Sequence, residues 1–393
     1  MIEKKVRILL ITPFFSPNVG GVESFLTEVV ALLRQKHVAL TVITYQPLIA
    51  KETAPIYCSE EGLEIIRLPW PKFGLFYRLE KHPILQFFYL GTGLLLGSIV
   101  KMVFSKRYST VLCHGMSAAV IGVALKKLFS VDLVTNIHTN YRFVRSYKAS
   151  FLASVLNQSR VVLALSQSTA ENLKFIGVKK EIIQVFYNWI NEENYYIADR
   201  QVTRKKLGIA SDFFVALFVG RFSVEKGIYE LVDALPDINR NIKILIVGGG
   251  KDERAVYEKV GKFENASCLG YKTAEELKVW FNAADILIYA SMDEDYLGRV
   301  AIESLFSGLP IMSPKYSNYS GKITPNIAEI PSDVGLYFEN GSKNFATSLN
   351  KLYESGEYKK FDRDFCRQHA IKKYGRAVNS GIYLRALGIS DVE

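Results

Sequence analysis

Cysteine is scarce in this sequence, and the few cysteines are far apart. The 393 residues include only four, Cys58, Cys113, Cys268 and Cys366. No two of them have the spacing of a zinc ligand pair or a redox pair. A reduced, cytoplasmic setting is therefore favoured over secretion, and we expect all four thiols to be buried structural side chains.

Clear targeting, metal-binding and nucleic-acid-binding signals are also lacking. The N-terminal MIEKKVRILLITPFF begins like a signal peptide, but its apolar stretch is short, Pro13 interrupts it and no small-residue cleavage site follows, so we interpret it as a first strand. No pair of histidines has helical ligand spacing and no Asp-rich triplet precedes a base-binding strand, so we expect neither a metal nor a cofactor. We find no nucleic-acid motif and no array of basic and aromatic residues, so we expect no nucleic-acid partner.

The composition, 49% hydrophobic and 22% charged, is that of a globular protein, and the length suits two domains. Continuous apolar runs are separated by helical stretches, which is typical of parallel sheets with helices on both faces. The expected strands are VRILLIT, VALTVIT, STVLCH, DLVTNIH, RVVLALS and IIQVFY in the first half and FFVALFVG, IKILIVG, DILIYA and LPIMS in the second. The expected helices are 22–36, 116–129, 166–176, 226–235, 251–261, 273–284 and 299–307.

A polar segment, residues 189–211, interrupts this alternation, and we expect the domain boundary there. The sequence thus predicts two doubly wound α/β domains, 1–195 and 196–365, followed by a C-terminal segment, 366–393. Two such domains in tandem leave a cleft, and ligands of such sheets bind beyond the carboxyl ends of the strands. The residues that follow each strand are therefore the candidates for a functional site.

The net charge of +10 is concentrated in the first half. Residues 1–195 hold 22 basic and 13 acidic side chains, whereas the remainder is nearly neutral at +1. The bias predicts an anionic partner, and an anionic membrane face or a phosphorylated acceptor fits better than nucleic acid.

One uncharged run, residues 84–100, is at the lower length limit for crossing a bilayer. We expect a helix packed in the first domain or lying on a membrane surface rather than a span. Basic and aromatic residues surround it in an interfacial mixture: Lys72, Arg78, Lys81, Lys101, Lys106 and Arg107, with Trp70, Phe73, Phe76, Tyr77, Phe87 and Phe88.

Several strands are followed by residues suited to binding phosphate or hydroxyl groups. SPNVGGVES puts two glycines between a strand and a helix, either for a tight turn or for close approach of an anion. GRFSVEKG places Arg221 and Lys226 in one loop, which is either a phosphate site or a solvated basic loop. SMDEDYLGRVAIESLFSGLP carries acids, of which Glu303 lies in an apolar helix and needs a reason to be buried.

Two other candidates are weaker. IVGGGKDE lacks the third glycine spacing of a dinucleotide fingerprint. His138 follows a strand, and either a local structural role or a role in the cleft would account for it. His114 is similarly placed, and we regard it as structural or cleft-lining.

The order of these motifs resembles glycosyltransferase family 4, whose members are retaining, nucleotide-sugar-dependent enzymes with the GT-B fold. The resemblance runs from about residue 6 to about residue 340 and rests on nine motifs in the family's order. They are SPNVGGVESF, VTNIHTN, LALSQSTAENLKFIGV, YNWINEENYY, VGRFSVEKGI, ILIVGGGKDE, CLGYKTAEEL, FNAADILIYAS and EDYLGRVAIESLFSGLPIM.

The resemblance implies roles for the residues that match. Gly20 and Gly21 would bring backbone amides to the donor's phosphates. Arg221 and Lys226 would neutralise the departing diphosphate, and His138 would lie near the transferred sugar. The residues implied in catalysis are His138, Arg221, Lys226 and Asp295, and those implied in donor binding are Gly20, Gly21, Gly270, Tyr271, Glu294, Tyr296, Leu297, Gly298 and Glu303.

The acidic motif departs from the family pattern. Glu303 matches the second acid and would hold the ribose hydroxyls, while Asp295 stands where the family has a glutamate that contacts the donor sugar. Glu294 next to it is the alternative for that contact. Residues 296–298 would offer amides to phosphate and sugar, and residues 270–271 would meet the base.

A second departure is Asn188-Trp189, which replaces the family's asparagine-glycine turn. The resemblance implies a hexosyltransferase that acts by front-face attack, and in this fold the last helix usually crosses back to the first domain, as residues 366–393 are placed to do. With Arg221 and Lys226 present, no divalent metal is required. The basic first half and the aromatic-basic segment favour a lipid-linked or glycan acceptor at the cytoplasmic membrane face. The alternatives are a nucleotide-sugar epimerase of the same fold and a catalytically inactive nucleotide-sugar-binding subunit.

Overall fold

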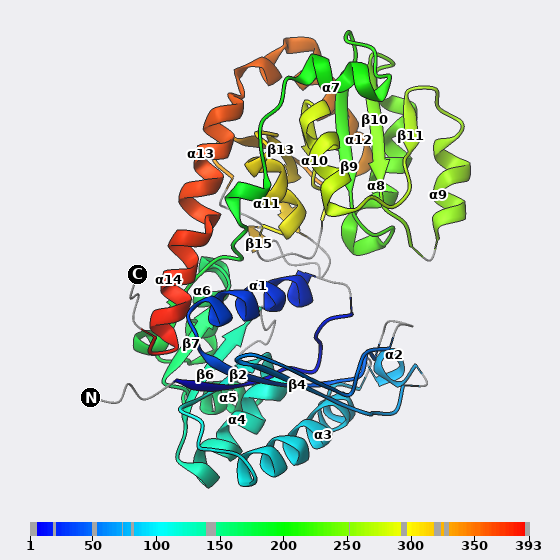
Figure 1. The fold of residues 1–393 in the computed structure, drawn as a ribbon. Coiled ribbons are helices and arrows are strands. Elements are labelled where there is room, and N and C mark those ends of the chain that lie inside the picture. Colours follow the sequence, from blue (N-terminus) through cyan, green and yellow to red (C-terminus); the bar gives the residue numbers. More distant parts are fainter. Residues whose placement is uncertain are drawn as a thin grey trace. The chain divides into compact units, whose positions relative to one another are not determined.

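The chain forms two compact units, shown in Figure 1 with colours that follow the sequence. The N-terminal unit comprises residues 1–188 and 379–393, and the C-terminal unit comprises residues 189–378. The computed structural model describes residues 6–18, 21–48, 53–72, 74–79, 82–138, 147–250, 252–291, 297–317, 324–325 and 330–389.

The N-terminal unit contains an eight-stranded sheet with the order β3-β4-β2-β1-β5-β6-β7-β8. All neighbouring strands are parallel except the antiparallel pair of β3 and β4. Strands β5 and β7 are buried along their whole length, and β1 and β6 are buried except at their first residue, as expected for a sheet covered on both faces. The strands are β1 (Arg7–Ile11), β2 (Ala39–Tyr45), β3 (Tyr57–Glu60), β4 (Leu63–Leu68), β5 (Thr110–His114), β6 (Asp132–Ile137), β7 (Val161–Ala164) and β8 (Ile183–Val185).

Helices follow the strands of this unit and cover its sheet. They are α1 (Gly21–Gln35), α2 (Leu75–Leu79), α3 (Pro83–Val103), α4 (Met116–Phe129), α5 (Tyr147–Leu156) and α6 (Gln167–Ile176), with the 3₁₀ turns η1 (Lys180–Ile182) and η2 (Glu192–Asn194), the latter at the start of the C-terminal unit. Helix α14 (Arg376–Ala386) returns to the N-terminal unit from Asn379 onward. There the Asn379 side chain accepts a hydrogen bond from the Tyr187 N–H at 2.9 Å, and the Asn136 amide donates to the Tyr383 hydroxyl at 3.3 Å.

The C-terminal unit contains a six-stranded parallel sheet with the order β11-β10-β9-β12-β13-β16. Its strands are β9 (Phe214–Val219), β10 (Ile242–Val247), β11 (Ala266–Cys268), β12 (Ile286–Ile288), β13 (Ile311–Pro314) and β16 (Gly335–Phe338), and a separate antiparallel pair is formed by β14 (Tyr316–Ser317) and β15 (Thr324–Pro325). The helices are α7 (Arg200–Leu207), α8 (Ile228–Ala234), α9 (Glu253–Val260), α10 (Ala274–Ala283), α11 (Arg299–Phe306), α12 (Ser342–Ser355) and α13 (Arg363–Tyr374), and the 3₁₀ turns are η3 (Val224–Lys226), η4 (Leu235–Asp237) and η5 (Glu357–Lys360).

The polar segment 189–211 is the first part of the C-terminal unit and not a linker. Trp189, Ile190 and Tyr195 are buried, and α7 lies within the segment. The sequence placed the boundaries at 195/196 and 365/366, whereas the units divide at 188/189 and 378/379. A few buried apolar side chains thus anchor a stretch that is polar on average.

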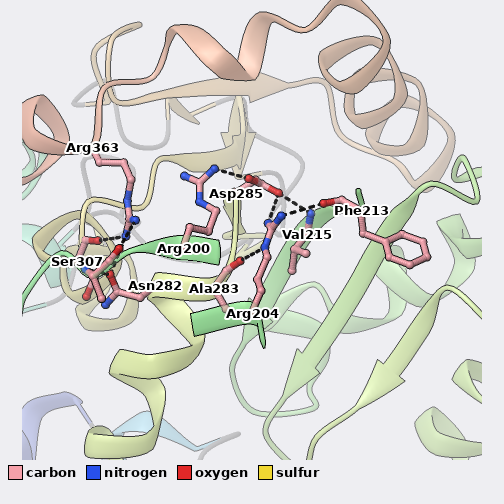
Figure 2. A network of polar contacts seen from close by, with 10 residues as sticks. Arg200, Arg204, Phe213, Val215, Asn282, Ala283, Asp285, Ser307 and Arg363 are labelled. Carbon is pink, nitrogen blue, oxygen red and sulfur yellow. Dashed lines mark hydrogen bonds and ion pairs between the residues drawn. The ribbon is translucent and has the colours of Figure 1, made fainter. Parts of the chain in front are cut away.

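An arginine network holds α7 against the C-terminal sheet at the end where β12 begins (Figure 2). The buried Asp285 carboxylate accepts hydrogen bonds from Arg200 and Arg204, each at 2.5 Å, and from the Val215 N–H at 2.7 Å. Arg204 also donates to the carbonyl oxygens of Ala283 and Phe213. The Asp285 carboxylate is therefore fully engaged within the cluster, although the buried Nε atom of Arg200 has no hydrogen-bond partner among the described residues.

The expected strands and helices are present, but six strands were not predicted. These are β3, β4, β11, β14, β15 and β16, which are short or carry charges that break the apolar run. The expectation of four buried thiols is wrong for two of them. Cys113 and Cys366 are buried, whereas Cys58 and Cys268 are partly exposed.

Candidate functional site

Three loops at the carboxyl edge of the C-terminal sheet are joined by backbone hydrogen bonds. The Gly220 N–H donates to the Val247 carbonyl at 3.0 Å, and the Gly248 N–H donates to the Gly270 carbonyl at 3.0 Å. These hydrogen bonds fix the loops that follow β9, β10 and β11 relative to one another, so the edge offers a preorganised surface.

The glycine cluster after β10 lets two of these loops come close together. Gly248 has φ +139, and a β-carbon there would lie 1.9 Å from the Gly220 carbonyl oxygen. No other residue fits at such an approach. The close approach of two loops therefore explains the first glycine of the cluster that fails as a dinucleotide fingerprint.

The two predicted cations lie in the loop between β9 and α8. Arg221 is exposed and Lys226 is partly buried at the end of η3. Gly227, the next residue, has φ +71, and a β-carbon there would lie 2.2 Å from the Ala290 carbonyl oxygen, so the loop lies close against the chain that follows β12. The loop therefore presents two positive side chains at the edge where ligands of such sheets bind.

An acid lies in the same loop, and sequence reasoning missed it. The pKa of Glu225 is lowered, first by the neighbouring Ser223 side chain and then also by the charges of Arg221 and Lys226. The Glu225 backbone carbonyl accepts a hydrogen bond from Ser291 at 3.3 Å. The ionised Glu225 carboxylate thus offsets part of the positive charge of the loop.

Glu303, which was expected to hold hydroxyl groups, is engaged within the unit. Its side chain is buried on α11, and a carboxylate oxygen lies 2.9 Å from Arg299 Nε. Burial raises the pKa of Glu303, while Arg299 and the Tyr195 hydroxyl favour the charged form. These two partners are the physical reason that an apolar helix can carry a buried acid, and its contact with a ribose remains a prediction.

The remaining predicted donor residues differ in their surroundings. The Gly270 carbonyl accepts from Gly248, and the Tyr271 side chain beside it is 76% exposed. Leu297 is buried, and the Gly298 N–H donates to the Tyr289 hydroxyl at 3.0 Å, so a ligand would compete with Tyr289 for that amide. Gly20, Glu294, Asp295 and Tyr296 lie outside the described residues.

A pair of histidines lies at the carboxyl edge of the N-terminal sheet. His114 ends β5 and His138 follows β6, and their ring centroids are 4.0 Å apart. Within the described part of the chain, neither buried Nε2 atom has a hydrogen-bond partner. Burial lowers the pKa of His114 to about 3, and burial together with His114 lowers the pKa of His138 well below its usual value. Both rings are therefore neutral near pH 7.

Helix α1, whose first residue is the expected phosphate-binding Gly21, packs against this pair through Phe25. Phe25 of α1 lies 5.6 Å from the His138 ring, and Gly21 is the first residue of the same helix. A β-carbon at Gly21 would meet no described atom within 4 Å, so packing in the described part of the chain does not require glycine there. Arg67 of β4 donates to the Ser16 carbonyl at 3.1 Å and holds the preceding loop, a contact that sequence reasoning missed.

The histidine pair predicts acid sensitivity of the N-terminal unit. Both folded pKa values are lowered, so below the unfolded value of about 6.5 the unfolded chain binds protons that the folded chain does not. Each histidine should then cost about 1.4 kcal/mol of stability per pH unit as the pH falls below 6. We expect His114→Gln to reduce the drop in melting temperature between pH 7.5 and 5.5.

The exposed His37, changed to asparagine, is the matched control, because asparagine tolerates the local φ of +53. Equal pH dependence in wild type and His114→Gln would contradict the assignment of the acid sensitivity to the pair.

Both halves of the chain match models of glycosyltransferase families. Residues 19–194 match the model described as Glycosyltransferase Family 4, and residues 199–376 match the model described as Glycosyl transferases group 1.

Among the described residues, no group of three or more His, Cys, Asp or Glu side chains is placed to hold a metal ion.

Individual proteins that resemble this chain in sequence include a glycosyltransferase and a glycolipid synthase. An uncharacterized glycosyltransferase of Methanocaldococcus jannaschii is 27% identical over 225 residues, which cover 52% of this chain and 57% of that protein. The alpha-monoglucosyldiacylglycerol synthase of Acholeplasma laidlawii is 26% identical over 220 residues, which cover 49% of this chain and 54% of that protein. The chain thus spans about half the length of the curated relatives that it matches.

Solved structures extend the likeness to the whole fold. The crystal structure of Anabaena HepE in complex with UDP has a TM-score of 0.73 at 16% identity and covers 98% of this chain and 99% of that chain. The two parallel-sheet units are therefore those of the GT-B fold, and the chain belongs to the group 1 glycosyltransferases.

Proposed function

We propose that the protein is a retaining glycosyltransferase that moves a hexose from a UDP- or GDP-sugar to a lipid-linked or polysaccharide acceptor at the cytoplasmic membrane face. The observation that carries the proposal is the loop of Arg221 and Lys226 at the carboxyl edge of the C-terminal sheet. A nucleotide donor is supported by the UDP bound to Anabaena HepE, and a lipid acceptor by the name of the Acholeplasma relative.

In this proposal the loop cations stabilise the departing diphosphate. Cleavage of the sugar–phosphate bond builds negative charge on the diphosphate and positive charge at the anomeric carbon. Arg221 and Lys226 would stabilise the negative charge without a metal, because fixed cations need little reorganisation. In front-face attack an oxygen of the leaving phosphate takes the acceptor's proton, so no carboxylate nucleophile is needed.

The N-terminal unit would contribute Gly21 and His138. No atom of the described residues lies within 4 Å of a β-carbon built at Gly21, which supports its proposed approach to the donor phosphates. His138 is neutral near pH 7, so it would act as a hydrogen-bonding group toward the sugar and not as a fixed cation.

A panel of UDP- and GDP-linked hexoses and hexosamines, scored for nucleotide release with a lipid acceptor, tests the proposal. One donor should release nucleotide only when the acceptor is present. A changed sugar without acceptor would indicate an epimerase. Calorimetric binding of UDP or GDP without turnover of any donor would indicate an inactive binding subunit.

Neutralising Glu225 should strengthen diphosphate binding. In Glu225→Gln the loop keeps its two cations and loses the carboxylate that offsets them. Because the group is exposed, we expect the affinity for UDP or GDP to rise only up to about fivefold at low salt. Calorimetric titration at low and high salt measures the change, and weaker binding in the variant would contradict this role of Glu225.

A further inference from the structure

Helix α3 is anchored to the N-terminal unit along its inner face. Leu90, Leu94 and Met102 are buried in the hydrophobic core of that unit. The Tyr45 hydroxyl donates to the Leu90 carbonyl at 2.9 Å and accepts from the Leu94 N–H at 3.0 Å, so it is inserted into the helical hydrogen-bond ladder. In Figure 1, α3 lies beside the strands of the N-terminal sheet. The sequence left open whether this segment is core or membrane-facing, and the inner face is core.

The outer face of the same helix is also apolar. Its exposed side chains are spaced three to eight residues apart and are each 56–61% exposed: Leu85, Phe88, Leu96, Val100 and Val103. Phe104, directly after the helix, is 85% exposed. A surface helix of a globular protein ordinarily has a polar outer face. The exposed Thr92 is the one polar side chain between Phe88 and Leu96 on this face, and an apolar stripe of this length marks an interaction surface.

Positive charge lies at the ends of this stripe. Arg78 of α2, Lys106 and Arg107 are exposed, and segment 67–107 contains seven basic residues and one acidic residue. At the end of α4, Lys127 and Leu128 are exposed, and Arg107 reaches the Ser130 carbonyl beside them at 3.3 Å. Apolar residues framed by cations complement a bilayer with anionic headgroups.

We propose that the outer face of α3 lies flat on an anionic membrane surface. Residues Leu85–Val103 are long and apolar enough to cross a bilayer, but the buried inner face keeps the helix on the protein, so it would lie along the interface. The inference rests on the proposed function in that a membrane-borne acceptor would give this docking its purpose. Docking itself requires neither donor nor acceptor.

Vesicle flotation without donor or acceptor tests the docking. Wild-type protein should float with vesicles that contain phosphatidylglycerol and much less with pure phosphatidylcholine, and high salt should weaken the binding. Phe88→Asp and Val100→Asp should each lower the partition coefficient at least about tenfold, since each replaces an inserted apolar group by a charge. Phe175→Asp on α6, at a site 58% exposed in the wild type, is the matched control and should bind like wild type.

Three results would overturn the inference. They are unchanged flotation of both aspartate variants, equal binding of wild type to neutral and anionic vesicles, and a dimer in light scattering that becomes a monomer in Phe88→Asp. Circular dichroism and UDP or GDP titration show whether each variant is folded. A Lys106→Glu/Arg107→Glu variant, outside the core, tests the charge contribution if the aspartate variants do not fold. Because nucleotide titration is separate from flotation, docking and the proposed function can fail independently.

Discussion

Arg221→Ala is expected to lower kcat about a hundredfold to a thousandfold, the usual loss when one fixed group that stabilises transition-state charge is removed. Arg221 lies in the exposed loop after β9, so its replacement should leave the fold intact. Charge on the diphosphate grows as the bond to the sugar breaks. The loss should therefore fall mainly on kcat and less on KM, which steady-state kinetics with the donor found in the panel can measure.

Arg240→Ala is the matched control for this experiment. Arg240 is an exposed arginine of the same unit, but it precedes β10 and so lies at the opposite edge of the sheet. Its replacement removes the same charge and should leave kcat unchanged. A kcat for Arg221→Ala within threefold of wild type, with Arg240→Ala also unchanged, would be roughly the loss of a weak surface ion pair and would remove the loop from the mechanism.

The fold could be predicted because its determinants are local. The strands of a parallel sheet that is covered on both faces are continuous apolar runs, and VRILLIT and FFVALFV show this plainly in β1 and β9. Edge strands such as β3 have one polar side and no such run, so the antiparallel hairpin with β4 was not predicted. The position of Arg221 and Lys226 at the sheet edge followed from their place directly after a strand.

The contacts that explain particular residues are distant in sequence and could not be predicted. The reason for glycine at 248 is the carbonyl of Gly220, and the partners of Glu303 include Tyr195. Residues 84–100 are apolar on every side of the helix, so the sequence pattern does not show which face is buried in the core. The position of this segment therefore stayed open. The structure places one face of α3 in the core and leaves the other exposed.

Asp285→Asn is expected to destabilise the C-terminal unit by about 3 kcal/mol. The side chains of Asp285 and Arg204 are 5% and 4% exposed, and the carboxylate is shared by Arg200, Arg204 and the Val215 N–H (Figure 2). The amide removes the negative charge, while the buried Arg204 guanidinium, the partly buried Arg200 guanidinium and the Val215 N–H remain around it. Breaking a buried pair is costly because the remaining charge is left without compensation.

Hydrogen exchange measured by mass spectrometry can assign this loss to one unit. Amides of β9 and β12 should exchange about a hundredfold faster in Asp285→Asn, whereas those of β5 in the N-terminal unit should be unchanged. Glu258→Gln is the control, since it breaks an exposed ion pair with Arg254 on α9 and should cost less than about 1 kcal/mol. If β9 and β12 exchange at the wild-type rate in Asp285→Asn, neutral hydrogen bonds suffice for this cluster. The negative charge of Asp285 would then not contribute to the attachment of α7 to the sheet.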